Sequence, residues 1–488
     1  MYAHITPNAT RHLIGGEWQD GESENVIAIF DPATGKQVAS MKEASLAQGD
    51  AAVEAAAAAL PAWSALSINR RAEIMLKMKA VVEDNVETLA LALSIDNGKT
   101  LAEARGEIGR AAEAIANAAS APMIYHSQFG NIAAGLDAKR VRVPVGVCVA
   151  VTPFNFPVMN PSMFASWVIV CGNTLVIKPS EQTPIVTNLL LDLFRQAGVP
   201  DGVLNIVHGG PELGNRLVSH PKVAAISCIT SSPVAKAIYE NGTAHGKRVQ
   251  ANGGGKNPYV VLSDADVERA VEGIADAAFG MAGQRCLAAS RCIVVGDIYE
   301  SFLEKLIARS KAYVMGSGRN PEATMGPLVS AASKARVLGA IEAAIKSGGK
   351  IALDGRAHEV KGGVETADGY FVGPTIVTGL DPKDPVDCRE VFGPFLVVHH
   401  VASFDEAVAI ANDTEFGNAA AIYTASGSQA RAFEMACRSG NIGVNTFPAP
   451  PMNFQMGGMG ASFYGDVHIL GDGYMQFFTD HKMVVSRW

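Results

Sequence analysis

The 488-residue chain has no basic tract and only modest charge. Charged residues make up 18% of it, the formal net charge is −8, and no block of five or six like charges occurs. Nucleic-acid binding depends on Lys and Arg clustered against phosphates. The charge pattern therefore argues against a nucleic-acid partner, and the hydrophobic content of 48% is ordinary for a globular protein.

Cysteine is scarce and scattered. The seven cysteines form no CxxC pair, and the eleven histidines form no HExxH motif and never group with cysteine. The cysteine positions are Cys148, Cys171, Cys228, Cys286, Cys292, Cys388 and Cys437. An odd, dispersed set predicts neither a disulfide framework nor a metal site.

Long hydrophobic runs are also missing. No apolar stretch approaches the roughly 18 to 20 residues that span a bilayer. The N-terminal "MYAHITPNATRHLIGGEW" lacks the charged and apolar regions of a signal peptide. We therefore expect a cytoplasmic protein without a membrane partner.

Three common signatures are absent as well. The sequence contains no GxGxxG, no GxxxxGK[ST] and no GxSxG. These absences exclude the usual dinucleotide fingerprint, the P-loop and the hydrolase nucleophile elbow. They do not exclude a nucleotide site of another design.

The chain instead shows long regions of regular secondary-structure signals. Residues 50–118 have the Ala- and Leu-rich, helically spaced pattern of helices, with the polyalanine as a packed helix face. Residues 141–261 alternate short β-branched runs with helical stretches, which indicates βαβ units, a parallel sheet and ligands beyond the strand ends. From residue 261 to about 461 the alternation resumes, which predicts a second α/β domain. The tail ends in alternating apolar residues and predicts an edge strand that a partner subunit would cover.

Four stretches carry a specific resemblance: "VTPFNFPVMNPS" from Val151, "VIKPSEQTP" from Val176, "GQRC" from Gly283 and "REVFGP" from Arg389. In their order and spacing, together with "LIGGEWQDG", "MGPLVS", "GYFVGPTI" and "FGNAAAIYT", they resemble the aldehyde dehydrogenase superfamily over nearly the whole chain. The resemblance implies an α/β fold with a Rossmann-like, parallel-sheet cofactor domain, an α/β catalytic domain and a small oligomerisation element.

The resemblance also implies boundaries for these parts. The NAD-binding domain would comprise residues 1–124 and 144–252, and the catalytic domain residues 253–465. Residues 125–143 and 466–488 would form the oligomerisation element, giving a homodimer or homotetramer.

Cys286 is the candidate nucleophile. A lone cysteine is usually an inert small hydrophobe, which is the interpretation for Cys292 in an apparent strand. Cys286 differs because small residues precede it and Arg285 adjoins it, and a nearby cation lowers a thiol pKa. By resemblance, Cys286 attacks the aldehyde. Asn155, which could otherwise cap a Pro-rich turn, resembles the donor that stabilises the oxyanion together with the Cys286 N–H.

The expected cofactor is NAD. Lys178 and Glu181 resemble the family's contacts to the adenosine ribose, although they could be an ordinary surface ion pair. A carboxylate at this place accepts hydrogen bonds from both ribose hydroxyls and repels a 2′-phosphate, which favours NAD over NADP. Glu390 and Phe392 resemble the pair that holds the nicotinamide ribose, and Thr152 and Phe154 would line the same channel.

The phosphate-side motif departs from the family pattern. The chain has "CITSSPVA", with Thr230 and Ala235 where glycines are expected. Ser231 is retained and can offer its hydroxyl and a helix-start N–H to a pyrophosphate. How Thr230 and Ala235 alter cofactor binding stays open.

The motif that normally supplies a water-activating glutamate is changed. The sequence has "QANGGGKNP", with Asn252 at that place, and no glutamate follows Glu434. An amide cannot accept a proton as a carboxylate does. Hydrolysis of a thioester on Cys286 should therefore be slow, and a thiol such as coenzyme A is a stronger nucleophile than water.

The branch of the family with "QAN" is the CoA-acylating methylmalonate- and malonate-semialdehyde dehydrogenases. "RCLAAS", "FGN" and "GASFYGD" resemble its segments, whereas Gln284 and "GGGKNP" depart from it. The branch implies a carboxylated aldehyde held by Arg110 and Arg285, whose planar forks suit a carboxylate. Decarboxylation would then give acetyl- or propionyl-CoA. Arg110 could alternatively be a helix-surface residue paired with Glu107 or Glu113.

Two other functions remain open from sequence. The first is a hydrolytic, NAD-dependent aldehyde dehydrogenase that uses some other base and releases a free acid. The second is a cysteine hydrolase or a non-catalytic binding protein on the same scaffold. A cysteine hydrolase needs a His base, and none adjoins Cys286 in the sequence.

Overall fold

Four helices precede the parallel strands of the first large sheet, as their sequence pattern predicts. The computed structural model describes residues 6–488, so residues 1–5 of the expected NAD-binding domain lie outside the described residues. Capping boxes at Ser45 and Thr100 start the first and fourth helices by satisfying their free N–H groups. The four are α1 (Leu46–Ser64), α2 (Ile68–Asp84), α3 (Val86–Asp96) and α4 (Leu101–Ala119).

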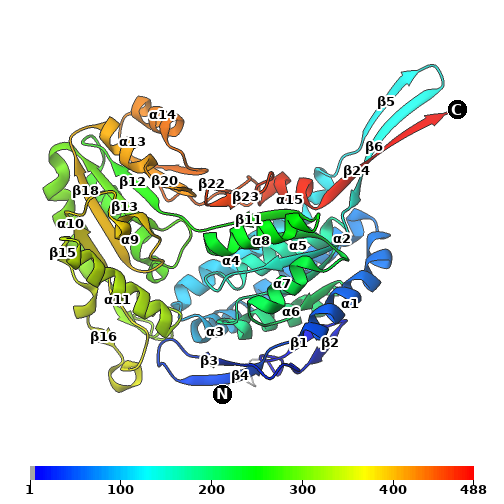
Figure 1. Ribbon diagram of the computed structural model, residues 1–488, viewed down its shortest axis with the longest axis horizontal. Coiled ribbons are helices and arrows are strands. Elements are labelled where there is room, and N and C mark those ends of the chain that lie inside the picture. Colours follow the sequence, from blue (N-terminus) through cyan, green and yellow to red (C-terminus); the bar gives the residue numbers. More distant parts are fainter. Residues whose placement is uncertain (1–5) are drawn as a thin grey trace.

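An eight-stranded sheet forms the centre of the first lobe (Figure 1). Its order is β2-β1-β9-β8-β7-β10-β11-β23, and the five strands from β9 to β11 are parallel. The strands are β1 (His12–Ile14), β2 (Glu17–Gln19), β7 (Val147–Val151), β8 (Thr174–Lys178), β9 (Leu204–Ile206), β10 (Val223–Ile229), β11 (Arg248–Asn252) and β23 (Phe463–Tyr464). The chain runs outward from β7 in one direction and then returns to β10 on its other side. This switch point opens a crevice beyond the strand ends.

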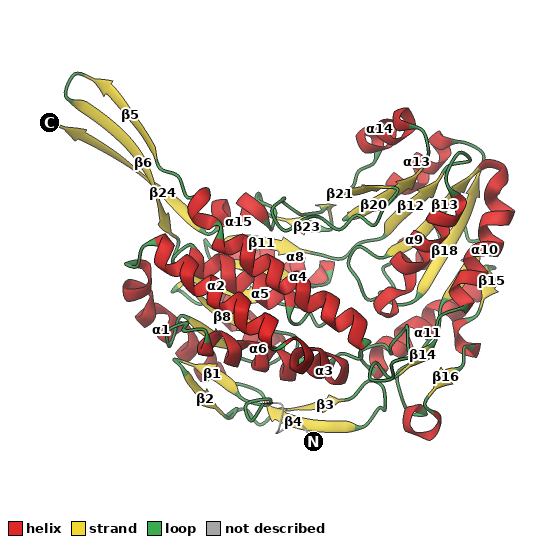
Figure 2. Ribbon diagram, turned by 180° about the vertical axis from the view of Figure 1, so that it is seen from behind, coloured by secondary structure: helices red, strands yellow, loops and turns green. Residues whose placement is uncertain are grey.

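Both faces of this sheet are buried, which explains its unbroken apolar strands. Along β7, Val147, Val149 and Val151 pack into one hydrophobic cluster, whereas Cys148 and Ala150 pack into the other. The covering helices include α5 (Met159–Val170) and α6 (Pro184–Gln196) on one face and α7 (Pro211–Ser219) and α8 (Ser232–Ala244) on the other (Figures 1 and 2).

A seven-stranded sheet forms the second lobe, with the order β15-β17-β18-β13-β12-β20-β21. All its pairs are parallel except β15 with β17. The strands are β12 (Asn257–Val261), β13 (Ala289–Val295), β15 (Lys350–Leu353), β17 (Thr375–Thr378), β18 (Phe395–Val401), β20 (Ala419–Tyr423) and β21 (Asn441–Val444). Its helices are α9 (Val267–Phe279), α10 (Tyr299–Lys311), α11 (Ala331–Lys346), α12 (Pro385–Cys388), α13 (Phe404–Asn412) and α14 (Gly427–Ala436).

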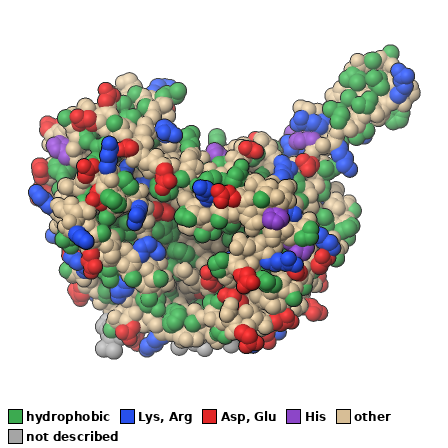
Figure 3. Space-filling view, in the orientation of Figure 1, with side chains coloured by type: hydrophobic (Ala, Val, Ile, Leu, Met, Phe, Trp, Pro, Cys, Tyr) green, Lys and Arg blue, Asp and Glu red, His purple; other side chains and the backbone are tan. Residues whose placement is uncertain are grey.

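A three-stranded arm projects from the first lobe (Figures 1 and 2). It consists of β5 (Gln128–Ala133), β6 (Leu136–Pro144) and β24 (Thr479–Arg487), and β24 is an edge strand as expected. Its surface is rich in apolar side chains (Figure 3), including Phe129, Ile132, Met483, Val485 and Trp488. An exposed apolar edge of this kind is typical of a surface that another chain covers.

The packing of helix α15 concerns the expected boundary of the oligomerisation element. The expected domain boundaries themselves remain a prediction. Helix α15 (Gly471–Phe477) lies in the range expected for oligomerisation, yet it packs into the first lobe's core. Tyr474 is fully buried there against Phe478 and Phe164. The remaining short strands are β3 (Val26–Phe30), β4 (Gln37–Lys42), β14 (Met315–Gly316), β16 (Val360–Lys361), β19 (Phe416–Gly417) and β22 (Met459–Gly460).

Membrane-spanning potential is confined to one bent helix pair. Among the described residues no single helix is long and apolar enough to cross a bilayer, although α1 and α2 together, bent by 118°, meet the length and composition criteria.

The fold agrees with the expected α/β class of two parallel-sheet lobes. The apolar run "VPVGVCVAV" from Val143 is divided between two strands, because β6 ends at Pro144 and β7 begins at Val147. Gly146 between them has a φ of +131°, a conformation that favours glycine and turns the chain.

Candidate active site

A left-handed turn leads into the loop that carries Cys286. Met281, Ala282 and Gly283 have φ values of 54°, 52° and 69°. For the two residues with side chains this conformation costs about 1 to 3 kcal/mol each. Gly283 is required on steric grounds too, since a Cβ there would lie 2.3 Å from the Gly393 carbonyl oxygen. The turn fixes how the nucleophile loop enters the site.

Two asparagine side chains hold the Cys286 backbone. Asn257 Nδ2 donates to the Cys286 carbonyl at 2.9 Å, and Asn418 Nδ2 donates to the same oxygen at 2.8 Å. Asn257 Nδ2 also donates to the Ala288 carbonyl at 2.8 Å. Asn257 starts β12 and Asn418 immediately precedes β20, so the second sheet positions the loop.

The thiol environment corrects one sequence-based expectation. The pKa of Cys286 is raised to about 11, chiefly by burial and then by the negative charge of Glu390. The backbone N–H groups of Cys286 and Leu287 and the charge of Arg285 lower it. Arg285 therefore acts in the expected direction, but burial and Glu390 outweigh it, because a buried thiolate loses its hydration.

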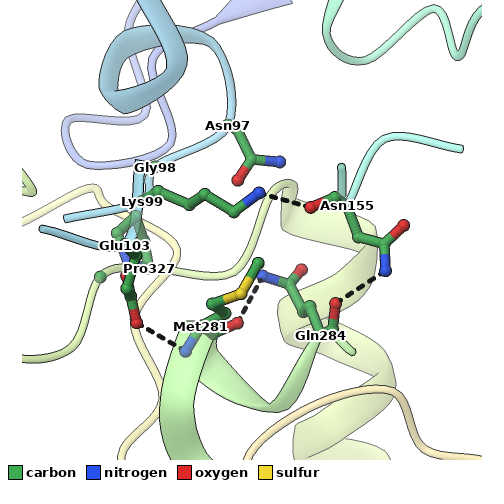
Figure 4. Close-up of a pocket in the computed structure, with 9 residues that line it drawn as sticks. Asn97, Gly98, Lys99, Glu103, Asn155, Met281, Gln284 and Pro327 are labelled. Atoms are coloured by element: carbon green, nitrogen blue, oxygen red, sulfur yellow. Dashed lines mark hydrogen bonds between the residues drawn. The ribbon is translucent and has the colours of Figure 1, made fainter. Parts of the chain in front are cut away.

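Asn155 lies beside the nucleophile loop. Its side chain is buried, and its Nδ2 donates to the Gln284 carbonyl at 3.0 Å (Figure 4). A primary amide has two N–H donors, so one hydrogen is free for a second acceptor. The arrangement links β7's following loop to the residue two before Cys286.

Asn155 and Cys286 line one cavity of about 400 Å³. Its walls are mostly apolar and methionine-rich, and Met side chains adapt to ligands of different shape. The apolar members include Phe156, Met159, Met163, Ile229, Leu287, Phe447, Met452, Met456, Ile469 and Leu470.

Both candidate substrate arginines line this cavity. Arg110 Nη1 pairs with Glu113 at 2.6 Å and its Nη2 donates to the Pro450 carbonyl at 2.9 Å. Arg285 pairs with Asp276 at 3.5 Å, and its guanidinium lies 4.7 Å from the centre of the Phe447 ring.

The ion pair of Arg110 decides between its two expected helix partners. Glu113 is the partner, and Glu107 is instead paired with Lys99. Arg110 pairs with Glu113 and also lines the cavity. The two interpretations of Arg110, as a helix-surface residue and as a carboxylate-binding residue, are therefore compatible.

Asn252 is also in the cavity wall. It ends β11, and its Nδ2 donates to the Cys228 carbonyl at 3.2 Å. Asn252 therefore places a neutral amide in the cavity that contains Cys286, at the position where a water-activating carboxylate is expected.

Each carboxylate that lines the cavity already accepts a hydrogen bond or forms an ion pair. Glu103 accepts from the Met281 N–H at 2.6 Å, Glu107 pairs with Lys99, and Asp276 pairs with Arg285. Residues 6–488 contain no group of three or more His, Cys, Asp or Glu side chains that could hold a metal ion.

Three predicted cofactor residues lie at the switch point of the first sheet. Thr152 follows β7, Lys178 ends β8, and Ser231 lies two residues after β10. The Thr152 hydroxyl is buried and has no hydrogen-bond partner within the described chain. Buried hydroxyls are normally paired, so this one is available to a ligand.

Lys178 and Glu181 form an ion pair at 3.3 Å, as the alternative interpretation of an ordinary surface pair predicts. Their exposure differs, however, because the Lys178 side chain is 9% exposed and that of Glu181 is 43% exposed. Lys178 Nζ also donates to the Gly209 carbonyl at 2.7 Å. A buried lysine and an accessible carboxylate therefore border the crevice.

Glu390 and Phe392 belong to the second lobe. Glu390 Oε1 accepts from the Gly255 N–H at 3.1 Å, and burial raises the pKa of Glu390 to about 7. Phe392 has a φ of 53°, and its ring meets that of Phe154 edge to face at 5.7 Å. The second lobe thus brings this pair against the residues that follow β7.

The changed phosphate-side motif needs no glycine in this structure. Neither Thr230 nor Ala235 has a positive φ, and Ala235 is fully buried in the core. Ser231 is the N-cap of α8, with an extended backbone. The helix start expected at this position is therefore present without the family's glycines.

Several residues of the site could not be found from sequence. Lys99, Glu107 and Asn257 act through backbone atoms far along the chain, such as the Asn155 carbonyl 56 residues from Lys99. Glu103 had a local signal, since "TLAE" is a capping box, but the capping box does not reveal its bond to Met281.

The family is shown by comparison with known proteins. The aldehyde dehydrogenase family model matches residues 18–484. The malonate-semialdehyde dehydrogenase 1 of Oceanobacillus iheyensis is 41% identical over 98% of this chain and 99% of its own length. The chain therefore belongs to the aldehyde dehydrogenase family and is an oxidoreductase of that class.

Two solved structures agree with the fold. A Sinorhizobium meliloti protein complexed with NAD is 35% identical, has a TM-score of 0.95, and the match covers 98% of this chain and 97% of that one. The methylmalonate-semialdehyde dehydrogenase of Oceanimonas doudoroffii is 34% identical, also with a TM-score of 0.95, and the match covers 98% of each chain. The expected α/β aldehyde dehydrogenase fold is confirmed.

Replacing Glu390 tests the electrostatics of the thiol. In Glu390→Gln the negative charge that raises the Cys286 pKa is gone, so more thiolate forms at a given pH. We expect iodoacetamide to alkylate Cys286 roughly two- to tenfold faster at pH 8, since each pKa unit changes the thiolate fraction tenfold. Mass spectrometry of the Cys286 peptide measures the rate. The exposed Glu434→Gln is the control, and equal rates in wild type and Glu390→Gln would contradict the assignment.

Proposed function

We propose that this aldehyde dehydrogenase oxidises a small carboxylated aldehyde with NAD and transfers the acyl group to coenzyme A. The observation that carries the proposal is the Asn252 amide in the cavity of Cys286, at the position where the hydrolytic branch has its base. An amide has no basic site for a proton, so the water route lacks its usual activator.

The residues at the switch point fit NAD. The unpartnered Thr152 hydroxyl, the Ser231 helix start and the accessible Glu181 carboxylate follow strands of the first sheet at the point where such sheets bind dinucleotides. From the second lobe, Phe392, two residues after Glu390, contacts Phe154. Glu181 would accept from the ribose hydroxyls and repel a 2′-phosphate, which supports NAD over NADP. When bound, NAD supplies the hydride acceptor of the reaction.

Cys286 and Asn155 would carry out the addition step. The Cys286 thiolate attacks the aldehyde carbon, and the carbonyl π electrons move to oxygen to give a thiohemiacetal anion. The free Asn155 N–H and a backbone N–H of the loop are donors for that oxygen. Losing one donor of this kind typically costs about 3 to 4 kcal/mol of barrier. Loss of hydride from the same carbon then leaves a thioester on Cys286.

A second thiol would release the acyl group. The sulfur of coenzyme A adds to the thioester carbonyl, the Cys286 sulfur leaves as thiolate, and the enzyme is restored. The 400 Å³ cavity gives space beside a small aldehyde for the end of a second thiol. The Glu103, Glu107 and Asp276 carboxylates that line the cavity are paired with a backbone N–H or with a cationic side chain. None of these three is therefore free to act in place of the missing base.

Arg110 and Arg285 would hold the substrate carboxylate. Both line the cavity, and each is paired with one neighbouring carboxylate. The names of the relatives support malonate or methylmalonate semialdehyde as the substrate class. After oxidation, loss of CO₂ from the carboxylated acyl thioester, with a proton taking its place on carbon, would give acetyl-CoA or propionyl-CoA.

A hydrolytic reaction is the second candidate, and Glu390 favours it. With a pKa of about 7 and a charge that reaches the Cys286 thiol, Glu390 could accept a proton from water at neutral pH. Its Oε1 accepts from the Gly255 N–H, and Phe392, two residues later, faces Phe154, so the pair suits the nicotinamide ribose better. The products distinguish the two reactions.

The apolar arm supports a homo-oligomer. Its edge strands β5 and β24 leave backbone groups unpaired, and the exposed side chains of Phe129, Met483 and Trp488 would be covered by another subunit. A dimer or tetramer built through residues 125–143 and 479–488 is the assembly that we propose.

Product analysis tests the proposed function. Purified protein with NAD, coenzyme A and malonate or methylmalonate semialdehyde is expected to form NADH and acetyl- or propionyl-CoA in equal amounts. Mass spectrometry identifies the products. Formation of the free acid in place of the CoA ester, with coenzyme A present, would support the hydrolytic candidate instead.

Restoring the family carboxylate gives a second prediction. Asn252→Glu places a base in the cavity beside Cys286, so water-dependent release of the acyl group should rise at least roughly tenfold, within the range of general-base catalysis. The measurement is NADH formation without coenzyme A over many turnovers. Asn252→Gln has a similar size without a basic group and is the matched control. If both variants give the same low rate, position 252 does not govern release.

A further inference from the structure

Three charged residues at the start of α4 contact both loops of the candidate active site. Lys99 lies just before the helix, and Glu103 and Glu107 are four residues apart on one helix face. The side chains of Lys99 and Glu107 are 3% and 1% exposed and form an ion pair with each other. We call Lys99, Glu103 and Glu107 the α4 brace.

The ion pair of the α4 brace holds the segment that contains Asn155. Lys99 Nζ donates to the Asn155 backbone carbonyl (Figure 4). Glu107 Oε1 accepts from the N–H groups of Val158 at 2.8 Å and Met159 at 3.0 Å, where α5 begins. One ion pair therefore fixes this segment at Asn155 and again three and four residues later.

Glu103 connects the same helix to the nucleophile loop. Its Oε2 accepts from the Thr100 N–H at 3.0 Å, which caps α4. Its Oε1 accepts from the N–H of Met281 in the left-handed turn before Cys286 at 2.6 Å. In Figure 4, Lys99 and Glu103 approach the Asn155 segment and the Met281 turn from the same helix start.

Stability alone is a weak reason for this arrangement. A buried ion pair gains little over apolar residues of similar size, because both charges lose their hydration. Burial lowers the pKa of Lys99, and the Glu107 carboxylate opposes that effect. The contacts instead end on backbone atoms of the Asn155 segment and of the turn that leads to Cys286. The separation of Asn155 and Cys286 sets the geometry of an oxyanion site.

We infer that Lys99 and Glu107 are positioning residues that hold Asn155 at the oxyanion site, while Glu103 keeps the nucleophile loop in register with it. The inference rests on the proposed function, because it takes Asn155 as the oxyanion donor. None of the three residues needs to touch the substrate for this role.

A double-mutant cycle tests the inference. The readout is the single-turnover rate of NADH formation at saturating NAD and aldehyde, before coenzyme A is added. Lys99→Met should slow this rate roughly 10- to 100-fold, as loss of an oxyanion donor does. In an Asn155→Ala background, Lys99→Met should change it by less than about twofold, because the donor that it positions is already gone.

Further readouts separate positioning from general damage. Lys99→Met should leave Cys286 alkylation by iodoacetamide unchanged, since its contacts lie on the Asn155 side. Arg105→Met, also in α4, removes an exposed ion pair with Glu87 of α3 and should leave the single-turnover rate within about twofold. If Lys99→Met fails to fold, the double variant Lys99→Met/Glu107→Gln takes its place in the same double-mutant cycle. It removes both buried charges and keeps a hydrogen-bond acceptor at position 107.

The outcomes distinguish two failures. If Lys99→Met slows the rate equally with and without Asn155, or does not slow it, the positioning role is wrong while the proposed function stands. If Asn155→Ala itself leaves the single-turnover rate unchanged, the oxyanion assignment fails and the inference fails with it.

Discussion

A single hydrogen bond, from the Asn155 amide to the Gln284 carbonyl, joins the two loops on which the chemistry depends. Asn155 follows the central strand of the first sheet, whereas Gln284 belongs to the second lobe's nucleophile loop. Neither lobe holds a complete site, so the packing of the lobes against each other is a condition for activity. The strained turn at Met281 and the asparagines that hold the Cys286 carbonyl serve the same requirement.

The polar groups that face the nucleophile are mainly amides and arginines. Asn155, Asn252 and Asn418 donate hydrogen bonds but take up no proton, while the nearby carboxylates of Glu107 and Asp276 are paired with cations. Such a cavity can stabilise an anion and hold an acid substrate. It is poorly equipped to activate water. Among the described residues, Glu390 is the group best suited to act as a base in spite of this, because its pKa is about 7 and its charge acts on the Cys286 thiol.

Much of the fold followed from periodicity, and the residues of the site from motifs. The β-branched runs and the helical spacing of Ala and Leu predicted the parallel strands and the helices because those signals are local. The motifs located Cys286, Asn155 and Asn252, which the structure brings to one cavity. The raised pKa of Cys286 was not predictable, since it depends on burial and on Glu390, 104 residues later in the chain. Lys99 and Glu107 were missed because they bind backbone atoms, which leave no mark in the sequence.

The stoichiometry of NADH formation without coenzyme A tests the central claim most directly. With saturating NAD and malonate semialdehyde, we expect a burst of one NADH per active site, an acyl group on the Cys286 peptide by mass spectrometry, and resumed turnover when coenzyme A is added. Linear NADH formation over many turnovers without coenzyme A, with free acid as the product, would contradict the account.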